Sequence, residues 1–348
     1  MSFKILVTFP ENGSVYGLPT PIFVQKLKNA LKKSNCRIVF PKFSGEEELT
    51  KLAEDADVAV VGGGIGNISG KVVENAKTLK LIQATGAGVD YLPFDSIAKR
   101  QALCVANTSG SNAVTVAEHA FALIFALCKH IVYQHNLLKD GTWHRLVSLE
   151  LSDKTLGIIG LGSIGIEVAK RAKAFGMRVI AVKRHPNKTD VDTMKVADLI
   201  VGRNKLIETL RESDFVVVCV ASTPETYGLI GETELRSMKK SAYLINVSRG
   251  TVVNEEALYM ALKERWIAGA GIDTWYNYPP NPEHEKVFAC FPPSKTGIHL
   301  LDDVVMTPHV GGLSKEFVER SIKLIANNIE RIAKGEEVIN KVNIALRY

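Results

Sequence analysis

Residues 155–165 read TLGIIGLGSIG, and this stretch decides the fold. A short strand predicted over 155–159 runs directly into the spacing GxGxxG at Gly160, Gly162 and Gly165. An amphipathic stretch over residues 164–176 follows and predicts a helix. Strand, glycine turn and helix in this order are typical of a dinucleotide-binding turn. The alternative is a tight turn whose glycines serve only the chain geometry.

Each glycine of such a turn has its own physical reason. Gly160 permits the tight bend, Gly162 lets a pyrophosphate approach the backbone, and Gly165 lets the helix pack closely on the strand. Ser163 and Ile164 begin the helix, whose free N–H groups and dipole favour an anion. The pattern therefore predicts that these five residues bind the pyrophosphate of a dinucleotide.

The end of the next predicted strand, residues 177–182, selects the dinucleotide. A protein that binds NAD places Asp or Glu there to accept hydrogen bonds from the ribose hydroxyls, whereas this chain has Lys183 and Arg184. A guanidinium binds a 2′-phosphate bidentately and stacks on adenine, while a carboxylate repels that phosphate. We predict NADP(H), with NAD as the alternative if Lys183 and Arg184 only form a solvated strand end.

The same alternation of short β-branched runs and amphipathic stretches extends in both directions from the glycine turn. It predicts an α/β fold of two Rossmann-like, doubly wound parallel sheets, separated by a long apolar helix over residues 113–138. A last strand over 304–309 leads into a helix that Gly335 ends, and this terminal segment either covers the second sheet or crosses back to the first. The expected strands are residues 4–9, 36–40, 58–62, 79–85, 155–160, 177–182, 214–220, 242–248, 267–273 and 304–309.

Composition narrows the class of protein. A chain of 348 residues with 46% hydrophobic residues is expected to form two domains with a cleft between them. The net charge of +6 is scattered, without a basic stripe, so nucleic acid is not expected as a partner. The five cysteines and eight histidines never fall in metal-ligand spacing, and we predict no metal site. No signal peptide or membrane span is recognised at the sequence level, which predicts a cytoplasmic protein in a reducing compartment.

Further motifs occur in a fixed order along the chain. They read GAGVD at 86–90, NTSG at 107–110, VAEHA at 116–120, TPET at 223–226, LINVSRG at 244–250 and TPHVGG at 307–312. Together with the glycine turn they resemble the D-isomer-specific 2-hydroxyacid dehydrogenase family, which includes glyoxylate/hydroxypyruvate reductases. The resemblance covers nearly the whole chain.

The resemblance implies a domain plan and an assembly. A substrate domain of residues 1–107 plus 315–348 is split around an inserted NAD(P)-binding domain of residues 108–314. It also implies a homodimer built on the cofactor domains, to which residues 113–143 contribute.

The resemblance also implies roles for single residues. Arg249 matches the catalytic arginine and His309 the acid/base, which agrees with the need for a cation to polarise a keto acid and a group near neutral pKa to donate a proton. Taken alone, Arg249 could form a structural ion pair, and His309 could be an ordinary loop histidine. Because both residues follow strands of one doubly wound sheet, where such folds bind ligands, the catalytic roles are favoured. Ala87 and Gly88, assisted by Gly64, match the loop that binds the substrate carboxylate. Further positions match the dinucleotide site: Val220, Ala221, Thr226, Val247, Ser248 and, at the nicotinamide end, Asp273.

One position departs from the family pattern. The family has a glutamate that pairs with the catalytic histidine, and this chain has Tyr278 there. Without a carboxylate, His309 is expected to be protonated less often at neutral pH. Our hypothesis is that the Tyr278 hydroxyl bonds His309 and orients its ring. The rival hypothesis uses residues 279–301, which carry Glu283, His284, Glu285 and Lys286.

These observations predict an oxidoreductase that transfers a hydride between NADP(H) and a small 2-keto/2-hydroxy acid, of the glyoxylate or hydroxypyruvate reductase type. The alternative is a binding or regulatory protein of the same fold that senses NAD(P)H with little turnover.

Overall fold

The computed structural model describes residues 3–348 except 32–34, 44, 64–65, 189–190 and 280–290. The described chain forms two compact units. Among the described residues, unit 1 comprises 3–112, Pro279 and 313–348, and unit 2 comprises Ala113–Tyr278 and 291–312. These divisions lie five residues after the first expected domain boundary and two residues before the second.

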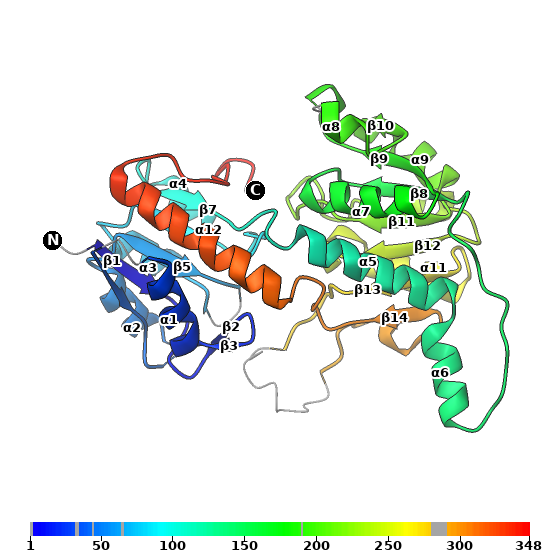
Figure 1. Ribbon diagram of the computed structural model, residues 1–348, viewed down its shortest axis with the longest axis horizontal. Helices are drawn as coiled ribbons and strands as arrows, with labels where there is room; N and C mark the ends of the chain where they lie inside the picture. Colours follow the sequence, from blue (N-terminus) through cyan, green and yellow to red (C-terminus); the bar gives the residue numbers. More distant parts are fainter. Residues whose placement is uncertain (1–2, 32–34, 44, 64–65, 189–190, 280–290) are drawn as a thin grey trace. The chain divides into compact units, whose positions relative to one another are not determined.

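Unit 1 contains a five-stranded parallel sheet in the order β4-β1-β5-β6-β7. Its strands are short and apolar, as expected for a sheet covered on both faces (Figure 1). Apolar residues of α2, α3 and α4 cover one face, and apolar residues of α1 and α12 cover the other. The strands are β1 Phe3–Val7, β4 Cys36–Val39, β5 Val58–Val61, β6 Leu81–Ala84 and β7 Cys104–Ala106, and a small hairpin joins β2 Ser14–Val15 to β3 Leu18–Pro19. The helices are α1 Thr20–Ala30, α2 Glu46–Ala53, α3 Gly70–Asn75, α4 Phe94–Ala98 and α12 Lys315–Lys334.

The C-terminal helix α12 belongs to unit 1, so the terminal segment crosses back to the first sheet. Ser314 caps its first turn by accepting a hydrogen bond from the Phe317 amide, and Gly335 ends it with φ +75°. In its middle, the buried Asn328 donates to Gln83 Oε1 on β6 at 2.8 Å. This bond ties the last helix of the chain to the first sheet.

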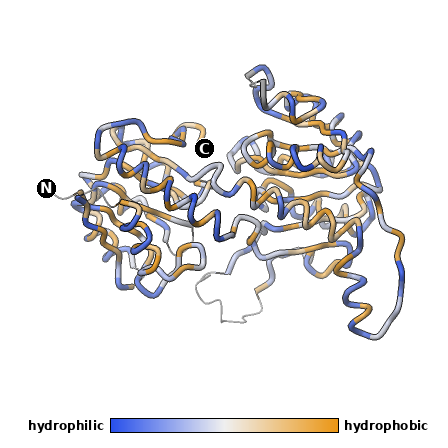
Figure 2. Tube along the Cα trace, in the orientation of Figure 1, coloured by the Kyte–Doolittle hydropathy of each residue, from blue (hydrophilic) through white to orange (hydrophobic). Residues whose placement is uncertain are grey.

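Unit 2 contains a seven-stranded parallel sheet in the order β10-β9-β8-β11-β12-β13-β14. Chain order reverses between β8 and β11, which is the switch point of a doubly wound sheet. The interior strands are apolar along their length (Figure 2), with α5 and α7 contributing to the core on one face and α9, α10 and α11 to the core on the other. The strands are β8 Thr155–Ile159, β9 Arg178–Val182, β10 Leu199–Val201, β11 Phe215–Val218, β12 Tyr243–Asn246, β13 Gly269–Ile272 and β14 Val304–Met306. The helices are α5 Ala113–Cys128, α6 Ile131–Lys139, α7 Ser163–Ala174, α8 Val191–Met194, α9 Leu206–Glu212, α10 Glu232–Ser237 and α11 Glu255–Lys263.

The two parallel sheets confirm the predicted fold class, and every expected strand has an observed counterpart. Three short features were not expected: β7, β10 and the hairpin of β2 and β3. Each of these strands has only two or three residues, which is too short for a periodic pattern to reveal.

The expected single helix over residues 113–138 is wrong, because it is two helices, α5 and α6, bent by 58°. His130 between them has φ +52°, in the left-handed region that ends a helix. The carbonyl of Cys128 accepts from the Leu149 amide, and that of Lys129 accepts from Gln134 Nε2. Within the described chain, no single helix is long and apolar enough to cross a membrane; only α5 and α6 taken together across their bend meet that test of length and composition.

Candidate active site

The predicted site residues of unit 2 follow the carboxyl ends of its strands. The glycine turn follows β8, and Lys183 and Arg184 follow β9. Arg249 lies three residues after β12, and His309 three residues after β14. Because all pairings in the sheet are parallel, these segments share one edge of it, where doubly wound folds bind ligands.

The glycine turn has the geometry that a dinucleotide needs. Gly160 has φ +107°, and a Cβ there would lie 2.8 Å from the Val220 side chain. A Cβ on Gly165 would lie 2.2 Å from the Gly160 carbonyl oxygen, so the close approach of α7 requires glycine. At Gly162, by contrast, no atom lies within 4 Å of the Cβ position. This open space at the start of the 12-residue helix α7 fits an approaching pyrophosphate.

A buried thiol lies under the turn. Cys219 Sγ donates to the Gly160 carbonyl at 3.0 Å. Burial raises the pKa of Cys219 to about 12. The side chain therefore stays a neutral thiol and gives the turn one more internal hydrogen bond.

The basic strand end has an acidic neighbour that the sequence did not reveal. Arg184 Nη2 lies 2.6 Å from Glu225 Oε2, which pairs the end of β9 with the loop after β11. Both side chains are partly exposed. Arg184 is thus held beside the loops that flank the glycine turn.

The predicted hydroxyl residues tie these loops together. Ser248 Oγ donates to the Val220 carbonyl at 2.6 Å, and Thr226 Oγ1 donates to the Ala221 carbonyl at 2.7 Å. Val247 is buried at the end of β12. These contacts position the backbone of the loops, and direct contact of these five residues with a cofactor stays a prediction.

Tyr278 and His309 meet at the carboxyl edge of β13 and β14. The Tyr278 hydroxyl lies 3.0 Å from His309 Nδ1, which confirms the hydrogen bond predicted from the sequence. The Trp275 amide donates to the same hydroxyl oxygen at 3.1 Å and so fixes its position. The rival partners Glu283, His284, Glu285 and Lys286 lie outside the described residues.

Arg249 lies on the neighbouring loop, half-buried and extended. Its carbonyl accepts from Asn246 Nδ2 at 3.0 Å, and its Nη1 donates to the Ser248 carbonyl at 3.0 Å. A Cβ on Gly250 would lie 2.3 Å from the Trp275 carbonyl oxygen. The loop after β12 therefore packs directly against the segment that leads to Tyr278.

Asp273 has a role that the sequence did not reveal. Its Oδ1 accepts from Thr307 Oγ1 at 2.6 Å and from the Val310 amide at 2.9 Å, and its Oδ2 accepts from the Gly311 amide at 3.0 Å. Although burial opposes ionisation, hydrogen bonds from His119, Thr307 and the Gly311 amide hold the pKa of Asp273 below its usual value. Asp273 is therefore an ionised carboxylate, and its hydrogen bonds hold the loop that carries His309.

Unit 1 presents the predicted carboxylate loop at the end of β6. The Gly86 carbonyl accepts from the Thr108 amide at 3.1 Å, and the Ala87 carbonyl accepts from Asn107 Nδ2 at 2.9 Å. Within the described chain, the N–H groups of Ala87 and Gly88 donate to no protein acceptor. Two available N–H groups in succession suit an anion. Gly64 lies outside the described residues.

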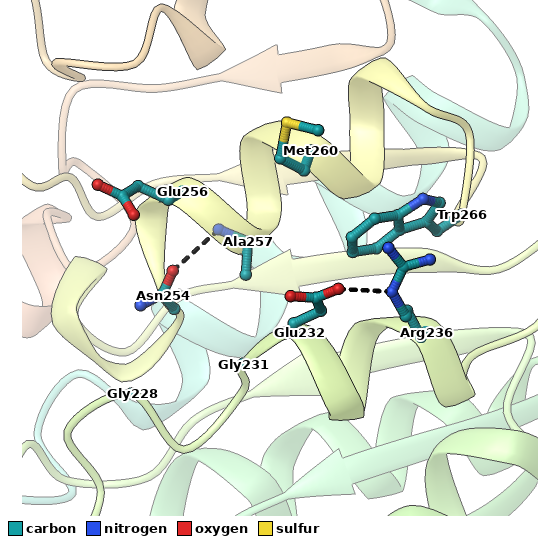
Figure 3. A pocket seen from close by; sticks show the side chains of 9 residues that line it. All are labelled: Gly228, Gly231, Glu232, Arg236, Asn254, Glu256, Ala257, Met260 and Trp266. Atoms are coloured by element: carbon teal, nitrogen blue, oxygen red, sulfur yellow. Dashed lines mark hydrogen bonds and ion pairs between the residues drawn. The ribbon is translucent and has the colours of Figure 1, made fainter.

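A separate pocket lies between α10 and α11 (Figure 3). Arg236 stacks on the Trp266 ring at 3.4 Å and pairs with Glu232 at 2.7 Å. None of the predicted catalytic or cofactor residues lines it. This pocket is therefore not the site that the sequence predicts.

A doubly wound sheet with a GxGxxG turn, an arginine and a histidine at its carboxyl edge defines a dinucleotide-dependent oxidoreductase. Residues 121–311 match the model of the D-isomer specific 2-hydroxyacid dehydrogenase family, NAD binding domain. The chain belongs to the D-isomer specific 2-hydroxyacid dehydrogenase family, whose members act on the CH–OH group of their donors with a nicotinamide dinucleotide.

Known relatives agree with this assignment. A glyoxylate reductase of Pyrococcus furiosus is 35% identical over 313 residues, which cover 86% of this chain and 87% of that protein. A D-3-phosphoglycerate dehydrogenase of Methanocaldococcus jannaschii is 36% identical over 86% of this chain, but the match covers only 54% of that protein, so this chain spans about half its length. The solved structure of an acyclic imino acid reductase in complex with NADPH and D-Arg is 28% identical, with a TM-score of 0.79, and the match covers 98% of this chain and 100% of that one.

Proposed function

We propose that this protein reduces a small 2-keto acid, of the glyoxylate or hydroxypyruvate type, to its 2-hydroxy acid with NADPH. The observation that carries the proposal is the hydrogen bond of His309 to Tyr278 at the sheet edge that also bears Arg249 and the glycine turn. The likeness to a glyoxylate reductase over 87% of that relative's length supports the same substrate class.

Each residue has a distinct part in the reaction. The guanidinium of Arg249 binds the carboxylate and the keto oxygen, and its charge stabilises the negative charge that develops on that oxygen. Bound NADPH supplies the hydride that reduces C2. His309 Nδ1 faces Tyr278, so Nε2 is the ring nitrogen that donates a proton to the keto oxygen and completes the hydroxyl group. Ala87 and Gly88 add N–H groups for the carboxylate.

The choice of NADP(H) depends on Arg184. A 2′-phosphate offers Arg184 a doubly charged, bidentate partner in exchange for the exposed carboxylate of Glu225. Exposed pairs such as Arg184–Glu225 contribute little to stability, so this exchange costs little. Lys183 adds a second positive charge at the same strand end.

The cofactor proposal predicts opposite effects for two charge changes. Arg184→Asp should weaken NADPH binding about 10–100-fold and NADH binding much less, because it replaces a charged hydrogen-bond donor with a repelling carboxylate. Glu225→Gln should strengthen NADPH binding, because it removes the competing carboxylate. Isothermal titration with each cofactor measures both effects. Equal losses for NADPH and NADH in Arg184→Asp would contradict the assignment.

The reductase proposal is tested by turnover. The protein should oxidise NADPH in the presence of glyoxylate or hydroxypyruvate, and Arg249→Ala should lower kcat/KM about 10²–10³-fold, since it removes the charge that stabilises the developing oxyanion. Arg249→Lys keeps the charge without the planar fork and should retain part of the rate. Tight NADPH binding without Arg249-dependent turnover on a broad 2-keto acid panel would favour the alternative, a cofactor-sensing binding protein.

We also propose a homodimer. Helix α6 has no buried residue in the chain, and exposed apolar side chains continue beyond it to Leu149. An isolated helix of nine residues is not stable in water, so this segment needs a partner surface. A second copy of the chain supplies it.

A further inference from the structure

A chain of partly buried hydrogen bonds supports the loop that carries His309. It joins three parts of unit 2: His119 on α5, Asp273 after β13, and Thr307 after β14. The Asp273 side chain is only 3% exposed. Two hydrogen bonds fix the backbone of Thr307: its amide donates to the Ile272 carbonyl, and its own carbonyl accepts from Trp275 Nε1 at 2.9 Å.

The direction of these bonds follows from the groups themselves. Asp273 is a carboxylate and accepts only, so the Thr307 hydroxyl donates its one proton to Oδ1 at 2.6 Å. The Thr307 oxygen must then accept from His119 Nε2, which lies 2.8 Å away. His119 therefore carries a proton on Nε2, which faces Thr307 Oγ1 at 2.8 Å and Asp273 Oδ1 at 3.4 Å.

The far end of the chain reaches the His309 loop through its backbone. Asp273 accepts from the amides of Val310 and Gly311, the two residues that follow His309. His309 itself has φ +58°, a left-handed conformation that a residue with a side chain rarely adopts. Two hydrogen bonds from the next two amides hold the backbone in this disfavoured state.

The side chains of Asp273 and His119 pack closely against Gly311. A Cβ on Gly311 would lie 2.7 Å from Asp273 Oδ2 and 2.9 Å from His119 Cδ2. Asp273 and the His119 ring thus lie directly against the backbone of the loop. A loop held from beneath in this way keeps the imidazole of His309 in one place relative to Tyr278.

We propose that His119 and Thr307 are positioning residues that act through Asp273 to hold His309 in its catalytic orientation. The inference rests on the proposed function of His309 and extends it to two residues with no assigned role. It also gives Asp273 a second task beside the one expected at the cofactor. None of the three side chains needs to touch the substrate.

Near-isosteric substitutions test the chain. Thr307→Val keeps the shape of the side chain and removes the hydroxyl, whereas Thr307→Ser keeps the hydroxyl. Thr274→Val is the matched control, because Thr274 directly follows Asp273 and is 1% exposed, but its hydroxyl has no hydrogen-bond partner in the described chain. His119→Gln keeps a donor near Nε2, and His119→Phe removes it.

Two measurements are made on each variant of the full chain. Thr307→Val and His119→Phe should lower kcat about tenfold at saturating cofactor, and should speed hydrogen–deuterium exchange at the amides of Val310 and Gly311. Thr307→Ser and His119→Gln should recover most of both losses, and Thr274→Val should match the wild type.

The outcomes separate this inference from the proposed function. If the wild-type protein shows no turnover, the proposed function is refuted but this inference is not. Hydrogen–deuterium exchange at Val310 and Gly311 then still tests whether His119 and Thr307 position the loop. Unchanged exchange and kcat in Thr307→Val would overturn the inference. It would equally be overturned by a defect confined to cofactor affinity, since Asp273 would then serve the cofactor only.

Discussion

Tyr278 holds the imidazole of His309 in a different way from the glutamate that the family has at this position. A carboxylate accepts a hydrogen bond from the ring N–H and favours the charged imidazolium, whereas a hydroxyl either donates or accepts a hydrogen bond and carries no charge at neutral pH. The Trp275 amide fixes the Tyr278 oxygen at 3.1 Å, so the hydroxyl is a defined partner despite its exposed position. His309 thus has a defined hydrogen-bond partner at Nδ1 that carries no charge.

This difference predicts the pH dependence of two variants. Tyr278→Phe should lower kcat about two- to tenfold, the rate equivalent of one lost hydrogen bond, because the ring loses its orientation. Tyr278→Glu should raise the pKa of His309. Because reduction needs protonated His309, the rate is lost as pH rises through that pKa, and the decline should move up by roughly one pH unit. A pH–rate profile from acid to neutral pH measures both, and a Tyr278→Phe profile identical to the wild type would discard the role of Tyr278.

Local motifs predicted the contact of Tyr278 with His309, but not the contacts of His119. Tyr278 was found because it replaces a residue of known role at a fixed distance from Asp273. His119 and Thr307 are 188 positions apart, and their bond exists only because α5 packs against the ends of β13 and β14. His119 lies in the motif VAEHA and Thr307 in the motif TPHVGG. Nothing in the spacing of the two motifs predicts that these residues are in contact. The pairing of Arg184 with Glu225 escaped prediction for the same reason.

At the scale of elements, strands were easier to predict than the end of a helix. Runs of β-branched residues in the sequence predict the buried strands of both sheets. The end of α5 does not, because Lys129 and His130 are ordinary helix residues. It is fixed by Lys129 Nζ bonding the Leu149 carbonyl at 2.6 Å and by the Leu149 amide bonding Cys128. The end of α5 therefore depends on Leu149, which lies twenty positions after Lys129 in the sequence.

Helix α12 depends on one buried polar side chain. Asn328 donates to Gln83 Oε1 and to the Ile339 carbonyl, and its own Oδ1 accepts from the Ile339 amide at 2.8 Å. Asn328→Ala should lower the free energy of unfolding by about 2–4 kcal/mol, because it leaves these buried groups unpaired. Its exposed neighbour Asn327 is the control, and Asn327→Ala should cost at most about 0.5 kcal/mol. Urea unfolding followed by circular dichroism compares them, and equal costs would refute a structural role for Asn328.

At the scale of the whole molecule, the sequence predicts that residues 113–138 are apolar. It does not predict that the apolar side chains of α6 are exposed in the folded chain. Six large apolar residues on or after α6 are exposed: Ile131, Val132, Tyr133, Leu138, Trp143 and Val147. The first five lie within residues 113–143, which the resemblance implies for the interface. Trp143 is 79% and Val147 93% exposed. Several exposed apolar side chains within one short segment are typical of an interaction site.

The homodimer proposal makes this segment the interface. Light scattering should give twice the mass of one chain, and Trp143→Glu together with Val147→Glu should give single chains, because buried unpaired carboxylates in an interface core cost several kcal/mol. Phe43→Glu is the matched control: Phe43 in unit 1 is 72% exposed but lies away from α6 in the chain, so its change should leave the mass doubled. The dimer should also quench or shift Trp143 fluorescence on assembly, whereas a wild-type mass of one chain at all concentrations would show that α6 is covered by something other than a second copy.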